Sequence, residues 1–163
     1  QMAYGMFRST CYEVGKNHYP EVKVDDYHID AMTAHMVRRL KDFDVIVTTN
    51  LFGDILSDLA GELTGSLGLA PSINSNETQC MAQAAHGSAP DIAGKNRANP
   101  VGLMLSAVML FHWLGDHHDD PKLSEAGNSM QDAIIKVMEA RILTPDMGGT
   151  ATTGFTDAVI KEI

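Results

Sequence analysis

Apolar residues recur at helical spacing over much of the chain. In residues 50–65 they lie three or four positions apart, on one face of a predicted amphipathic helix: Leu51, Phe52, Ile55, Leu56, Leu59 and Leu63. The stretch from Pro100 to Gly115 is apolar nearly all round, which is typical of a helix inside a core. Further helices are predicted over residues 4–16, 31–40 (with Asp30 as N-cap) and 122–142, and a last one after a glycine-rich loop that begins at 144.

Two segments have the pattern of strands. Residues 21–30 alternate apolar and polar side chains, and residues 43–49 (FDVIVTT) form a continuous β-branched run, which predicts a strand buried on both faces. The order strand, helix, strand, helix predicts an α/β fold. Residues 64–100 are rich in small residues and have no clear periodicity. A long stretch of that kind is usually functional or disordered.

Acidic residues outnumber basic ones by 21 to 12, for a formal net charge of −9. This balance disfavours nucleic acid and membrane surfaces as partners, because both attract a basic patch. No apolar run approaches the roughly 18 residues of a membrane span. A small anionic substrate stays compatible with the charge if a metal ion or local cations offset the repulsion.

The cysteines and the first residues bear on the compartment. Cys11 and Cys80 are too few for a disulfide framework, and the start QMAYGMFRST has no signal-peptide pattern. We therefore expect two buried thiols in an intracellular protein, cytoplasmic or mitochondrial. The first residue is not Met, which suggests a fragment.

Three aspartates at helix starts or on helix faces are candidate metal ligands. Asp54 and Asp58 are four residues apart, so their carboxylates point the same way from one helix. Together with Asp30 they would form a carboxylate set suited to Mg²⁺ or Mn²⁺. The alternative is an ordinary solvated acidic face, which Glu62 would extend. The other acidic cluster, GDHHDDPK at 115–122, is interpreted as a solvated connector between helices.

The segment 86–100, HGSAPDIAGKNRANP, is a candidate cofactor loop. Its small residues would let backbone amides approach a ligand, and an acidic side chain can accept hydrogen bonds from the two hydroxyls of a ribose. His86 could donate to a phosphate or a hydroxyl. An ordinary ordered loop is the alternative.

Three segments in one order are similar to the metal-dependent β-decarboxylating dehydrogenases, which include isocitrate, 3-isopropylmalate, homoisocitrate and tartrate dehydrogenases. They are FDVIVTTNLFGDILSDLAG, HGSAPDIAGKNRANP and TPDMGGTATT. The resemblance implies an isopropylmalate-dehydrogenase-like α/β fold, of which this chain is the C-terminal part. Residues 1–63 would belong to the dimerisation and substrate domain, and residues 64–163 to the cofactor domain.

The resemblance also implies a site. Asp30, Asp54 and Asp58 would bind Mg²⁺ or Mn²⁺, with Asp30 reaching the active site of a partner subunit in a homodimer or higher oligomer. The substrate would be a 2-hydroxy polycarboxylate. The cofactor NAD would contact His86, Gly87, Ser88, Ala89, Asp91, Ile92, Asn99 and Asp146.

Asp91 followed by Ile92 is the NAD form of the motif, whereas NADP-dependent relatives have Lys and Tyr there. Two features depart from the family pattern. Gln83 occupies a position where the family has Glu, and the catalytic Lys and Tyr would lie upstream of this chain. We therefore expect the chain alone to be inactive. A regulatory or assembly subunit, or a truncated protein with only a scaffold or dimerisation role, is the alternative to an enzyme.

Overall fold

The computed structural model describes residues 2–163, and the chain divides into two compact units between Thr48 and Thr49. The expected domain boundary near residue 63 concerns a longer subunit and stays a prediction.

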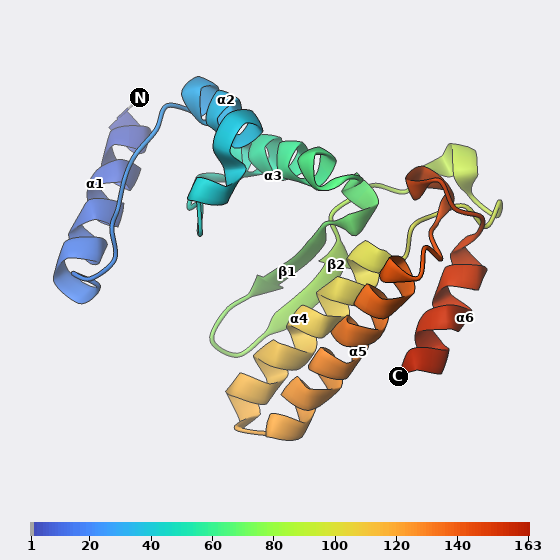
Figure 1. The fold of residues 1–163 in the computed structure, drawn as a ribbon. Coiled ribbons are helices and arrows are strands. Elements are labelled where there is room, and N and C mark those ends of the chain that lie inside the picture. Colours follow the sequence, from blue (N-terminus) through green and yellow to red (C-terminus); the bar gives the residue numbers. More distant parts are fainter. Residues whose placement is uncertain (1) are drawn as a thin grey trace. The chain divides into compact units, whose positions relative to one another are not determined.

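The first unit contains two helices, α1 (Met2–His18) and α2 (Ile29–Arg39), and the short 3-10 helix η1 (Leu40–Asp42) (Figure 1). Asp26 ties the segment after α1 back to that helix, because it accepts hydrogen bonds from Arg8 (2.9 Å) and from the Tyr12 hydroxyl (2.6 Å). These two bonds lower the pKa of Asp26 to about 2. The helices are predicted correctly, but His28 is the N-cap of α2, and Asp30 lies inside its first turn.

The two segments predicted as strands in this unit are not strands. Val45 and Val47, expected to be buried on both faces, are 88% and 67% exposed. A strand needs a neighbouring strand to satisfy its backbone hydrogen bonds. Among residues 2–163 the only ladder is a two-stranded sheet elsewhere in the chain, so residues 43–49 have no pairing partner there.

The second unit begins with α3 (Asn50–Thr64) and the 3-10 helix η2 (Leu67–Leu69). An antiparallel hairpin of β1 (Pro71–Ser75) and β2 (Cys80–Ala84) follows, with Ser72 opposite Gln83. The remaining elements are η3 (Pro90–Ile92), α4 (Val101–His118), α5 (Pro121–Glu139), η4 (Pro145–Met147) and α6 (Thr152–Glu162). The hairpin was missed from the sequence, where residues 64–100 showed no strand pattern.

Helix α4 is the centre of this unit. It packs against both strands and against α5, and α5 in turn contacts α6 (Figure 1). The core consists of buried side chains from these three helices: Val101, Ala133, Ile134, Val137, Phe155 and Val159. Such close-packed burial of apolar area is the main source of stability.

The buried hydroxyl of Ser106 joins α4 to the hairpin. Its oxygen accepts a hydrogen bond from the Ser72 amide (2.9 Å) and lies 2.7 Å from the Gln83 carbonyl. Ser106 is fully buried. The backbone of Gln83, the residue that departs from the family pattern, is therefore held in the sheet, while its side chain is exposed.

Two smaller predictions need correction. Helix α4 does not end at Gly115 but continues through both histidines to His118, so the expected connector shrinks to Asp119 and Asp120 before α5. Cys11 and Cys80 are free thiols, as expected, but they are half-buried rather than buried. Among residues 2–163, no helix is long and apolar enough to cross a bilayer.

Candidate functional site

Helix α3 presents the predicted carboxylate pair. Its apolar face is turned inward through Leu56, which is buried, whereas Asp54 and Asp58 lie on the exposed side. Among the described residues, neither carboxylate has an ion pair or a hydrogen-bond donor. Two exposed, unpaired carboxylates on one helix face are hard oxygen ligands, and they fit a divalent cation such as Mg²⁺ or Mn²⁺.

Asp30 lies in the first unit, on α2, and is also exposed. One of its carboxylate oxygens accepts a hydrogen bond from the Ala31 amide at 2.8 Å. Asp30 and the pair on α3 belong to different units, and the joint role of the three carboxylates stays a prediction. No group of three or more His, Cys, Asp or Glu side chains within residues 2–163 has the geometry of a metal site.

The candidate cofactor loop has an exposed first half. His86, Gly87, Ser88, Ala89 and Asp91 are exposed, and Ile92 is half-buried. The His86 ring lies 2.9 Å from the Gly87 carbonyl. Ala89 adopts a left-handed backbone (φ 39°) and leads into the single turn of η3. This turn presents Asp91 to solvent with no hydrogen-bond or ion-pair partner among the described side chains.

The second half of the loop is fixed to the start of α6. The Asn96 side chain donates to the Thr153 hydroxyl (2.9 Å) and accepts from the Thr153 amide (3.0 Å). The Thr152 hydroxyl donates to the Ala98 carbonyl at 2.5 Å. Asn96 thereby satisfies one of the unpaired amides at the helix start. The result is an open acidic turn held on a rigid support, which is a suitable arrangement for ligand binding.

Asn99 and Asp146, both predicted to contact the cofactor, contact each other. The Asn99 amide donates to Asp146 Oδ2 at 2.9 Å, and its carbonyl oxygen accepts from the Val101 amide at 3.0 Å. Ser66 donates to the same Asp146 oxygen at 2.5 Å, and the Thr144 hydroxyl donates to the other at 2.6 Å. Sequence reasoning missed Ser66, because no local pattern marks a contact across 80 residues. It also missed Thr144, although that residue lies only two positions before Asp146.

These hydrogen bonds set the charge state of Asp146. Partial burial raises its pKa, but the bonds from Ser66, Thr144 and Asn99 stabilise the ionised form and outweigh it. The net effect is a pKa below the ordinary value, so Asp146 is an anion at neutral pH.

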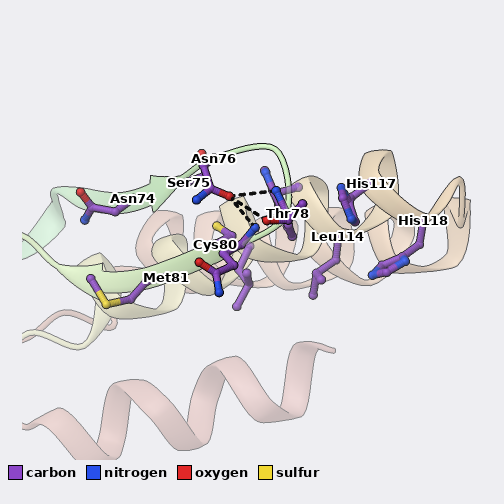
Figure 2. A pocket seen from close by; sticks show the side chains of 12 residues that line it. Asn74, Ser75, Asn76, Thr78, Cys80, Met81, Leu114, His117 and His118 are labelled. Carbon is purple, nitrogen blue, oxygen red and sulfur yellow. Dashed lines mark hydrogen bonds between the residues drawn. The ribbon is translucent and has the colours of Figure 1, made fainter.

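An open groove of the second unit, about 730 Å³, lies elsewhere. It runs between the hairpin turn and the C-terminal part of α4, and Figure 2 shows Asn76 and Thr78 in that turn. The side-chain oxygen of Asn76 accepts hydrogen bonds from the Thr78 and Gln79 amides. On the α4 side the His117 ring stacks on Trp113, with centroids 4.7 Å apart. None of the predicted site residues lines this groove.

The profile of the isocitrate/isopropylmalate dehydrogenase family matches residues 1–163. An isocitrate/homoisocitrate dehydrogenase of Thermus thermophilus is 47% identical over 163 residues, which cover 99% of this chain and 46% of that protein. A 3-isopropylmalate/3-methylmalate dehydrogenase of Methanocaldococcus jannaschii is 43% identical over 149 residues, or 91% of this chain and 42% of that protein.

Solved structures agree. The crystal structure of isocitrate dehydrogenase from Methylococcus capsulatus superposes with a TM-score of 0.89 at 37% identity, covering 97% of this chain and 45% of that one. A β-decarboxylating dehydrogenase from Thermococcus kodakarensis gives 0.84 at 39% identity, covering 99% and 46%. The chain belongs to the isocitrate/isopropylmalate dehydrogenase family, and the predicted α/β fold class is confirmed. It spans about half the length of these relatives.

Proposed function

We propose that this chain is the cofactor-side part of an NAD-dependent and Mg²⁺- or Mn²⁺-dependent dehydrogenase. The reaction would be the oxidative decarboxylation of a 2-hydroxy acid of the isocitrate or 3-isopropylmalate type. The observation that carries the proposal is the position of Asp91. Its carboxylate is exposed and unpaired in the first half of the candidate cofactor loop, and the second half of that loop is fixed to α6. Family membership supports the reaction class.

In this proposal Asp91 binds the adenosine ribose of NAD by accepting hydrogen bonds from its two hydroxyls. The exposed residues before it, from His86 to Ala89, would lie along the cofactor and offer backbone amides to it. Asp54 and Asp58 would hold the cation together with Asp30 of a partner subunit. A divalent cation bound there would polarise the substrate hydroxyl and stabilise the negative charge that develops as CO₂ leaves.

The proposal assigns no acid or base to this chain. Hydride would pass from the secondary alcohol carbon of the substrate to the nicotinamide, and the Lys and Tyr of the family would supply proton transfer from the part of the relatives that this chain does not match. The enzyme would be a homodimer or a higher oligomer with shared active sites. The candidate substrates are isocitrate, 3-isopropylmalate, homoisocitrate and tartrate.

The test is NAD and NADP reduction by the complete protein with Mn²⁺ and each of the four substrates. We expect turnover with NAD and one preferred substrate, and none from residues 1–163 alone. Turnover by the 163-residue chain would contradict the assignment of acid and base to other parts. A complete protein that binds no NAD and turns over no substrate would support a regulatory or assembly subunit instead.

A further inference from the structure

The carboxylate of Asp146 joins parts of the second unit that have separate roles in the proposed function. Ser66 is the second residue after α3, the helix with the metal pair, and it donates to Asp146 Oδ2 at 2.5 Å. Asn99 lies at the end of the candidate cofactor loop and donates to the same oxygen at 2.9 Å. Asp146 Oδ2 therefore accepts one hydrogen bond from the segment after α3 and one from the candidate cofactor loop.

Each donor is itself held in place. The Ser66 hydroxyl accepts a hydrogen bond from the Gly68 amide at 3.1 Å and so caps the start of η2. Helix η2 in turn packs against α3. Asn99 is only 8% exposed and accepts from the Val101 amide at the start of α4. A change at Asp146 would therefore reach both the end of α3 and the end of the loop.

The same bonds leave Asp146 little capacity for a ligand. A carboxylate has about four lone-pair positions. Oδ2 accepts two hydrogen bonds, from Ser66 and Asn99, and Oδ1 accepts one from Thr144. Asp91, by contrast, has all of its positions free among the described residues.

We propose that Asp146 is a positioning residue, which holds the candidate cofactor loop and the C-terminal end of α3 in a fixed relation through Asn99 and Ser66 without contacting the cofactor. The inference rests on the proposed function and extends it, because it replaces the expected cofactor contact of Asp146 with a link between the cofactor and metal sides. It follows that NAD and metal dependence should change together when the link is broken.

The experiment compares variants of the complete protein by steady-state kinetics. Asp146→Asn keeps the size of the side chain but removes its charge and leaves one acceptor oxygen in place of two. We expect a roughly tenfold rise in KM for NAD, the scale of one lost charge-assisted hydrogen bond. The Mn²⁺ concentration for half-maximal activity should rise severalfold, and kcat should change less than KM. Asp132→Asn, an exposed aspartate on α5, is the matched control and should change neither.

Reversing the pair provides the decisive variant. In Asn99→Asp/Asp146→Asn the new amide can donate to the new carboxylate, which can still accept from the Val101 amide. We expect this double variant to recover at least half of the lost NAD affinity. Ser66→Ala removes one donor to Asp146 and leaves Asn99 and Thr144 in place. It should raise both the KM for NAD and the Mn²⁺ concentration for half-maximal activity, and it replaces Asp146→Asn as the test if that variant does not fold.

Three results would overturn the inference. The first is a change in KM for NAD without any change in Mn²⁺ dependence and without rescue by the reversed pair, which is the signature of a direct cofactor ligand. The second is wild-type behaviour of both Asp146→Asn and Ser66→Ala. The third is a wild-type protein that does not reduce NAD at all. This third result removes the proposed function too, whereas the first two leave it intact.

Discussion

The side-chain amide of Asn99 donates a hydrogen bond to the Asp146 carboxylate across 2.9 Å, although 47 residues separate the two in the sequence. The contact fixes the second half of the candidate cofactor loop, residues 86–100, to the turn at Pro145–Met147. Two residues that looked like independent cofactor contacts in the sequence are partners in the fold.

The lowered pKa of Asp146 predicts how this contact responds to acid. A carboxylate with a folded-state pKa below its unfolded value of about 4 stabilises the fold above that pH. Its contribution is lost as the pH falls from about 4 through the lower folded-state pKa. The difference in unfolding free energy between wild type and Asp146→Asn should therefore be largest at pH 6 and shrink toward pH 3.

Urea unfolding followed by Trp113 fluorescence measures this difference in the second unit, because Trp113 is the only tryptophan of the 163 residues and lies in α4. The difference between wild type and Asp132→Asn should stay flat over the same range. A wild-type advantage over Asp146→Asn that does not depend on pH would contradict the role of the charge.

Gly149 predicts a strong stability effect in the neighbouring turn. A Cβ atom at this position would overlap the backbone carbonyl of Leu143, and the Gly149 amide donates to the Thr144 carbonyl at 2.8 Å. Gly149→Ala should therefore lower the free energy of unfolding by at least about 2 kcal/mol. Gly154→Ala in α6, where a Cβ meets nothing within 4 Å, should be neutral or stabilising by up to about 1 kcal/mol. Thermal unfolding of both variants checks this, and equal midpoints would refute it.

Local sequence patterns predicted the helices well. The spacing of apolar residues placed α3 over 50–65, and the structure has it at Asn50–Thr64. The end of α4 was wrong because Gly115 was interpreted as a helix terminator. In the structure Gly115 lets α4 approach α5, since a Cβ there would overlap the Ser124 hydroxyl. A small residue needed for helix packing and one that ends a helix look alike in sequence.

Patterns failed where the outcome depends on distant partners. Residues 43–49 have every local feature of a buried strand, yet no described segment pairs with them. The hairpin was missed because its strands, PSINS and CMAQA, do not alternate β-branched and polar residues. It is held instead by a distant partner, because α4 packs against it and Ser106 of α4 hydrogen-bonds to its backbone. The exposed Asp54, Asp58 and Asp91 were predicted as site residues from motif and spacing, and their roles stay predictions. The Ser66–Asp146 bond could be found only in the fold.

Asp54 and Asp58 give a test of the metal site in the complete protein. Asp54→Asn or Asp58→Asn should reduce activity more than about a hundredfold, since even outer-shell changes at metal sites cost 10–100-fold. Both side chains are exposed and unpaired, so folding should change little. Glu62→Gln on the same helix is the matched control and should keep full activity. Mn²⁺ should raise the unfolding temperature of wild type and of Glu62→Gln, but not of the two Asp variants. Equal activity and equal Mn²⁺ stabilisation of all three variants would mean that Asp54 and Asp58 are part of an ordinary solvated acidic face and bind no metal.

Asp91 and Ile92 predict the choice of cofactor. Asp91 is exposed without a partner, so its carboxylate is free to accept from the ribose hydroxyls, an interaction of about 1.5–3 kcal/mol. The same carboxylate would face the 2′-phosphate of NADP, where two negative charges repel in a partly desolvated site. Both effects favour NAD.

The double variant Asp91→Lys/Ile92→Tyr should reverse this preference, because the new lysine can neutralise the phosphate and the tyrosine can donate to it. The measurement is kcat/KM for both cofactors in the complete protein. We expect the NAD to NADP ratio to fall by at least about a hundredfold, the sum of a lost ribose contact and a gained phosphate contact. Asp157→Asn on α6 changes a carboxylate outside the loop and should leave the ratio unchanged. Asp91 has no hydrogen-bond or ion-pair partner among the described side chains, but Ile92 is half-buried, so thermal unfolding of the double variant is measured beside the kinetics to show that it folds. An unchanged ratio in a folded double variant would mean that this turn does not hold the ribose.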